Sequence, residues 1–69
     1  KDGLNLGAHC QGRAVDVLCH GKDAFDLIHI AIHKGIKRIG VSQSGELSKR
    51  FIHIDNITHG KPCPWIWSY

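Results

Sequence analysis

Two side chains that can bind a metal ion lie close together near the start of the sequence. The stretch GAHCQGRAVDV holds His9 and Asp16, with Gly12 between them. Gly12 allows the chain to bend, so that a histidine in a loop and an aspartate in the next strand can face one ion. An unpaired aspartate buried among apolar residues costs several kcal/mol. Asp16 must therefore be exposed, hydrogen-bonded or bound to a cation.

A second histidine and aspartate follow in the run RFIHIDNI, residues 50–57. Its alternating pattern predicts a strand with Ile52 and Ile54 facing the core. His53 and Asp55 then share the opposite face. That face is either the solvated side of an antiparallel strand or one wall of a site.

His9, Asp16 and His53 together have the composition of a catalytic zinc site. Such a site uses three protein ligands and keeps one position for water, whose pKa the metal lowers toward neutrality. Two imidazoles and one carboxylate suit zinc-dependent hydrolysis. The three cysteines form no C-x-x-C pair, which argues against a structural zinc knuckle, and their odd number excludes a complete disulfide framework within one chain.

The residues between these motifs predict one helix, from Asp23 to Lys34. Asp23 is a suitable N-cap, and Gly35 is a suitable residue to follow the helix. His29 and His33 lie one turn apart, but they fall beside polar positions and are expected on the solvated surface. Apolar residues at helical spacing form the expected core face: Phe25, Ile28, Ala31 and Ile32, with Leu27 adjoining.

Short strands are predicted around the helix, at residues 13–18, 37–41 and within 50–57. The polar run SQSGELS, residues 42–48, is typical of a turn that joins two hairpin strands. The tail GKPCPWIWSY cannot be helical across its two prolines. Its aromatic residues alternate, and they either line a substrate groove or, as we expect for so small a chain, close the core: Trp65, Trp67 and Tyr69.

Length and composition limit the possible functions. The chain has 69 residues, of which 22% are charged and 42% hydrophobic, a balance typical of one globular domain. A core of this size needs further support from a metal, a disulfide, a partner chain or residues that precede Lys1, and we suspect an N-terminally truncated core. The net charge of +3 is too scattered for a nucleic-acid interface. No apolar run approaches the roughly 20 residues of a membrane span.

The two motifs resemble those of the zinc D-Ala-D-Ala carboxypeptidase family, whose relatives include phage endolysins and the Hedgehog signalling domain. The pattern G-x-H-x-x-G-x-A-x-D, residues 7–16, is similar to the family signature S-x-H-x-x-G-x-A-x-D, with Gly7 in place of the serine. FIHID is similar to the segment F-[IV]-H-[IV]-D that provides the third ligand in one branch. PWIW, residues 64–67, is similar to the Trp-bearing end of that branch. The match covers nearly the whole chain, from Gly7 to about Trp67.

This resemblance implies that His9, Asp16 and His53 bind Zn²⁺. It implies an α+β fold, with a small antiparallel sheet and one main helix packed on it, over a single domain of residues 1–69. It also implies hydrolysis of a peptide bond in peptidoglycan stem peptides, either the terminal D-Ala-D-Ala bond or an internal cross-bridge bond. A bacterial cell envelope or a phage lysis protein is the corresponding setting, with no nucleic-acid or membrane partner.

The chain departs from the family where a general base is expected. Many members place an acidic residue three positions before the last histidine, and that position is Arg50 here, which cannot accept a proton from zinc-bound water. Another branch uses a histidine five positions before, which is Ser48 here. Asp55 and Glu46 remain as candidate bases. Asp55 has a competing role as the acceptor that fixes the tautomer of His53.

The substrate contacts and the activity itself stay open. The family has a substrate-binding arginine before the first motif, which this chain lacks, and Arg13, Arg50 and Trp65 are the candidates for that role. One function is a zinc peptidase acting on the bacterial cell wall. The alternative is a non-catalytic zinc-binding or wall-binding module that kept the ligands and lost the base. A structural domain with coincidental motifs is the third interpretation.

Overall fold

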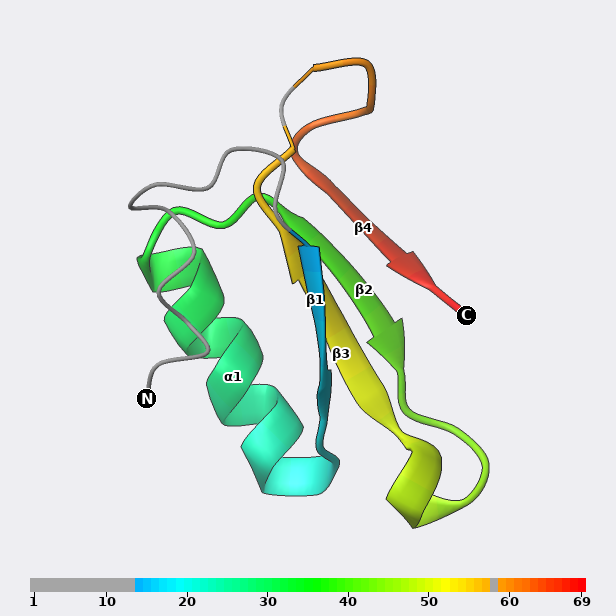
Figure 1. The fold of residues 1–69 in the computed structure, drawn as a ribbon. Helices are drawn as coiled ribbons and strands as arrows, with labels where there is room; N and C mark the ends of the chain where they lie inside the picture. The colour runs from blue at the N-terminus through cyan, green and yellow to red at the C-terminus, as the bar shows by residue number, and fades with distance from the viewer. Residues whose placement is uncertain (1–13, 58) are drawn as a thin grey trace.

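A computed structural model describes residues 14–57 and 59–69, in which one helix packs on one face of a four-stranded sheet (Figure 1). The predicted α+β class with one main helix is therefore confirmed. The elements in chain order are β1 (Ala14–Leu18), α1 (Gly21–His33), β2 (Arg38–Ser42), the short 3₁₀ helix η2 (Leu47–Lys49), β3 (Phe51–Asp55) and β4 (Trp65–Ser68). Among the described residues, no helix is both long and apolar enough to cross a membrane.

The strand order is β1-β3-β2-β4, and the sheet is mixed. β3 lies antiparallel to both β1 and β2, whereas β4 pairs parallel with β2. The prediction of a wholly antiparallel sheet is therefore wrong for the last strand. The direction of β4 is set by the segment that connects it to β3. β3 ends at Asp55, which lies opposite Arg38 at the start of β2. β4 then begins at Trp65, which also pairs with Arg38. Because β4 starts where β2 starts, the two strands run in the same direction.

The helix begins earlier than its sequence predicts. Its N-cap is His20, which makes no side-chain capping bond, and Asp23 lies in the first turn. The prediction of Asp23 as N-cap is therefore wrong, although a carboxylate in the first turn still complements the helix dipole. Gly35 has a φ of 93°, the left-handed conformation expected just after a helix C-terminus, which confirms its predicted role.

The helix buries a face that only partly matches the predicted one. Ala31 and Leu27 are buried as expected, but Phe25 is 71% exposed and Ile32 59% exposed. Ala24, which is 4% exposed, is buried in place of the larger residues. The helix packs against three buried isoleucines from the sheet: Ile39, Ile52 and Ile54.

The aromatic tail does not close the core. Trp65 and Tyr69 are exposed and Trp67 is only half-buried, so this expectation is wrong. The isoleucines of β2 and β3 fill the space under α1 instead. Beside them, an apolar groove of about 640 Å³ is lined by residues that include Ile32, Ile36 and Ile66.

Candidate metal centre

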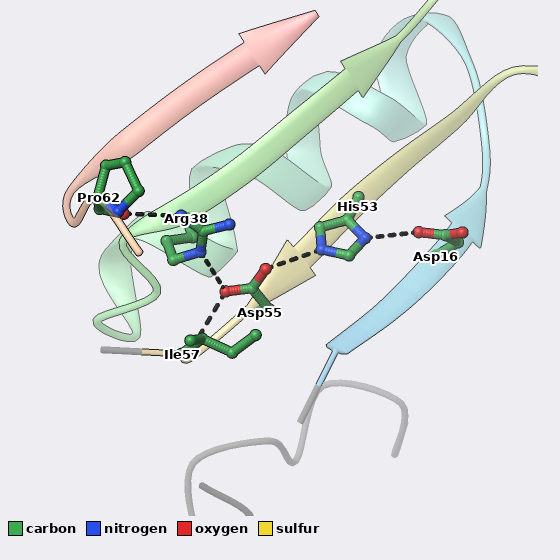
Figure 2. A network of polar contacts seen from close by, with 6 residues as sticks. All are labelled: Asp16, Arg38, His53, Asp55, Ile57 and Pro62. Atoms are coloured by element: carbon green, nitrogen blue, oxygen red, sulfur yellow. Dashed lines mark hydrogen bonds and ion pairs between the residues drawn. The ribbon is translucent and has the colours of Figure 1, made fainter. Parts of the chain in front are cut away.

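The strand register brings two of the three predicted zinc ligands together. Asp16 on β1 lies directly opposite His53 on β3. The Cys19 amide donates to the Arg50 carbonyl at 3.0 Å, and ladder positions alternate, so Asp16 and His53 form a non-hydrogen-bonded pair, in which side chains approach most closely. Asp16 Oδ1 and His53 Nδ1 are 2.8 Å apart (Figure 2). The two strands thus bring both predicted ligands into contact.

The other ring nitrogen of His53 contacts a buried carboxylate on the same strand. His53 Nε2 lies 2.8 Å from Asp55 Oδ2, and Asp55 is only 1% exposed. Asp55 Oδ1 accepts hydrogen bonds from Arg38 Nε at 2.7 Å and from the Ile57 amide at 3.1 Å. Arg38 Nη1 in turn donates to the Pro62 carbonyl at 2.7 Å. A continuous chain of polar contacts therefore runs from Asp16 to the loop before β4 (Figure 2).

These contacts decide what His53 can offer to a metal. An ionised Asp55 only accepts hydrogen bonds, so His53 Nε2 must carry a proton in order to donate to it. Nδ1 of a neutral ring then directs its lone pair toward the Asp16 carboxylate. Two such electron-pair donors 2.8 Å apart need a proton or a cation between them. Asp16 and His53 therefore share either a hydrogen-bonded proton or a cation.

The environment of Asp55 favours its role as a hydrogen-bond acceptor over that of a general base. Burial raises the pKa of the Asp55 carboxyl, but the hydrogen bonds from His53, the Ile57 amide and Arg38, together with the Arg38 charge, outweigh it. The pKa is therefore lowered from its ordinary value of 3.8. A buried, ionised carboxylate that already accepts three hydrogen bonds has no access to water on the surface of the sheet. It fixes the His53 tautomer, as carboxylates beside ligand histidines commonly do.

We expect this lowered pKa to make the fold sensitive to acid. A carboxyl whose pKa is lower in the folded than in the unfolded state stabilises the fold above its unfolded pKa. For Asp55 this stabilisation is lost as the pH falls through about 4 toward the lower folded pKa. Thermal unfolding from pH 7 to pH 2 should show a steeper loss of melting temperature below pH 4 in the wild type than in Asp55→Asn. Parallel curves would contradict this assignment.

Three residues that sequence reasoning missed complete the surroundings of His53. Arg38 anchors Asp55, Gly40 lies opposite His53 on β2, and Trp67 lies opposite Gly40 on β4. The centroids of the Trp67 and His53 rings are 5.4 Å apart. The glycine in the middle of the strand RIGVS could have indicated that another residue lies close to the backbone there. A strand interior seldom uses glycine without a close neighbour.

The remaining candidates lie elsewhere. His9 and Arg13 fall outside the described residues. Glu46 is exposed in the loop after β2, with its carboxylate 3.9 Å from the ammonium of Lys49. Arg50 donates to the Gly45 carbonyl at 3.1 and 2.8 Å. Within the part of the chain that the structure describes, neither Glu46 nor Arg50 joins the contacts of Asp16 and His53.

Trp65 begins β4, three strands away from Asp16. Its predicted contact with substrate stays a prediction. Among residues 14–57 and 59–69, no group of three or more histidine, cysteine, aspartate or glutamate side chains gathers that could hold a metal ion. His9, the third ligand that the sequence motif predicts, lies outside these residues. Comparisons with known protein families, curated proteins and solved structures found no match for this chain.

Proposed function

We propose that this chain is the core of a zinc-dependent peptidase that hydrolyses peptide bonds in peptidoglycan stem peptides. The observation that carries the proposal is the 2.8 Å approach of Asp16 Oδ1 to His53 Nδ1, with the far nitrogen of His53 held by buried Asp55. A pair of donors so oriented fits zinc, and the motif of residues 7–16 adds His9 as the third ligand. The resemblance to the D-Ala-D-Ala carboxypeptidases supplies the substrate class.

The residues of the site have separate tasks. Asp16, with a side chain that is 60% exposed, would hold the ion at the surface of the sheet, where a peptide can reach it. His53 would bind through Nδ1, and Asp55 keeps the proton on Nε2. A bound zinc ion supplies a Lewis acid and a water that ionises near neutral pH. The hydrogen bonds from His53, the Ile57 amide and Arg38, together with the Arg38 charge, lower the pKa of Asp55 and so favour the ionised carboxylate that supports the His53 ring.

A second function is favoured by one observation. Arg50 stands where the family places its acidic base, and it is engaged with the Gly45 carbonyl. Asp55 is buried, which leaves the exposed carboxylate of Glu46 as the candidate base. If Glu46 does not reach the metal, the chain is a zinc-binding or wall-binding module without hydrolytic activity.

An assay of peptidoglycan digestion and of D-Ala release from a stem pentapeptide separates these functions. Wild type loaded with zinc should release product, and a chelator should stop the reaction. His53→Ala should be inactive. His33→Ala, which removes an exposed histidine from α1, is the matched control and should keep wild-type activity. Zinc binding without hydrolysis would establish the second function, and equal activity of wild type and His53→Ala would rule out the peptidase.

A further inference from the structure

One residue from each strand forms a row across the face of the sheet that α1 does not cover. Asp16 lies opposite His53, His53 lies opposite Gly40, and Gly40 lies opposite Trp67. Residues directly opposite each other on neighbouring strands point to the same face. The row therefore places the Trp67 indole of β4 beside Asp16 of β1 and His53 of β3, with only a glycine of β2 between them.

The Trp67 indole occupies the space that a Cβ atom at position 40 would need. A Cβ atom on Gly40 would lie 2.6 Å from both Cε2 and Nε1 of Trp67, and 2.8 Å from Cζ2. Carbon atoms of two residues do not approach this closely, since their optimal separation is about 3.5–4.0 Å. The indole thus rests directly on the backbone of Gly40. Any larger residue at this position would push it away.

In this position, Trp67 contacts two members of the polar chain, His53 and Arg38. Its ring centroid lies 5.4 Å from that of His53, at an interplanar angle of 53°, within the range of favourable aromatic pairs. The guanidinium carbon of Arg38 lies 5.0 Å from the Trp67 ring centroid, a cation–π distance. His53 is therefore enclosed between Asp16 on one side and Trp67 on the other.

We propose that Trp67 is a positioning residue of the metal centre, which holds the His53 ring so that Nδ1 faces Asp16. This role rests on the proposed function, because it is a role toward the zinc ion that Asp16 and His53 bind. Gly40 has the complementary task of leaving room for the indole. β4 thus contributes no ligand but is required for tight zinc binding. The His53 ring, already fixed by Trp67, loses less freedom when the ion binds.

Zinc affinity and the NMR signals of the His53 ring nitrogens test this role in the full chain. Trp67→Ala should weaken zinc binding by roughly 10-fold or more, the usual effect of losing a support around a ligand. It should also shift the His53 ring signals in metal-free protein. Trp67→Phe keeps an aromatic face and should stay within about threefold of wild type. Trp65→Ala, two residues away and without a ring contact to His53 among the described residues, is the matched control and should change neither readout.

A double-mutant cycle separates positioning from a general loss of stability. Gly40→Ala displaces the indole and should weaken zinc binding about as much as Trp67→Ala. In the Trp67→Ala background the same methyl group meets no ring, so Gly40→Ala should add little further loss. Additive losses in the cycle would overturn the proposal. Amide NMR spectra show whether each variant is folded, and Trp67→Leu replaces Trp67→Ala if the latter is not.

The failure of this role is distinguishable from the failure of the zinc proposal. If the wild type binds no zinc, the proposed function is wrong, but the His53 ring signals of the metal-free variants still report whether Trp67 orients the ring. If the wild type binds zinc and Trp67→Ala matches it in both zinc affinity and ring signals, Trp67 has no positioning role. The Co²⁺-substituted protein gives an independent readout, because its visible absorption follows the geometry of the ligands rather than the overall stability.

Discussion

Replacing Asp55 with alanine is expected to lower the free energy of unfolding by about 3–5 kcal/mol. Asp55 is 1% exposed and its partner Arg38 is also buried, with 2.7 Å between Oδ1 and Nε. Removal of the carboxylate leaves the guanidinium charge buried and uncompensated. A domain of this size has a total stability near the lower end of about 5–15 kcal/mol, so most of the variant should be unfolded at 37 °C. Urea denaturation followed by tryptophan fluorescence measures the loss.

The matched control for this variant is an ion pair on the surface. Lys22 and Asp26 are 2.6 Å apart on exposed turns of α1, where water and salt screen their attraction. Asp26→Ala should therefore change the midpoint of urea denaturation by far less than Asp55→Ala. If the two variants lose similar stability, the buried pair does not have the structural role assigned to it. The double variant Arg38→Leu, Asp55→Leu should recover part of the loss, because no unpaired charge is left in the interior.

The second large effect is expected on zinc binding. Asp16→Asn and His53→Ala each alter one of the three proposed ligands and, if zinc binds there, should weaken its binding by roughly 100-fold or more. Because Asp16 is 60% exposed and makes its contact at the surface, Asp16→Asn should remain folded without metal. Zinc at 100 times its dissociation constant should stabilise the wild type by about 2.7 kcal/mol, and this gain should vanish in both variants at the same zinc concentration.

Exposed histidines supply the control for these zinc measurements. His29 and His33 lie one turn apart on the solvated side of α1, where a pair of imidazoles can also take up metal. Replacing both with alanine should leave the affinity of the tight site and the zinc-induced rise in melting temperature unchanged. A loss of zinc binding in this double variant, with retention in His53→Ala, would place the metal on the helix.

The sequence predicted that Asp16 and His53 lie on strands because the relevant patterns are local. Alternation in FIHID assigned Ile52 and Ile54 to the core and His53 and Asp55 to the other face, and the structure confirms this. The apolar neighbours of Asp16 likewise placed it on a strand. These inferences needed only the period of a strand, which each segment carries in its own residues.

What the sequence could not predict depends on partners far apart in the chain. Alternation gives the face of a residue but not the residue opposite, so the contacts of Asp55 with Arg38 and of Gly40 with Trp67 were missed. The apolar residues of the helix fall on two overlapping faces, and the sequence does not say which of the two packs on the sheet. Ala24 is buried and Phe25 is exposed, and this choice depends on how the helix packs on the sheet, which the spacing of apolar residues does not give. The parallel direction of β4 depends in the same way on where β3 ends.

The most direct test is a zinc-bound structure of the full chain. We predict one ion with Asp16 Oδ1 and His53 Nδ1 at about 2.0–2.2 Å, with His53 Nε2 still donating to Asp55. His9 should supply the third ligand. Zinc bound through His53 Nε2, or bound away from Asp16 and His53, would contradict the proposed metal centre.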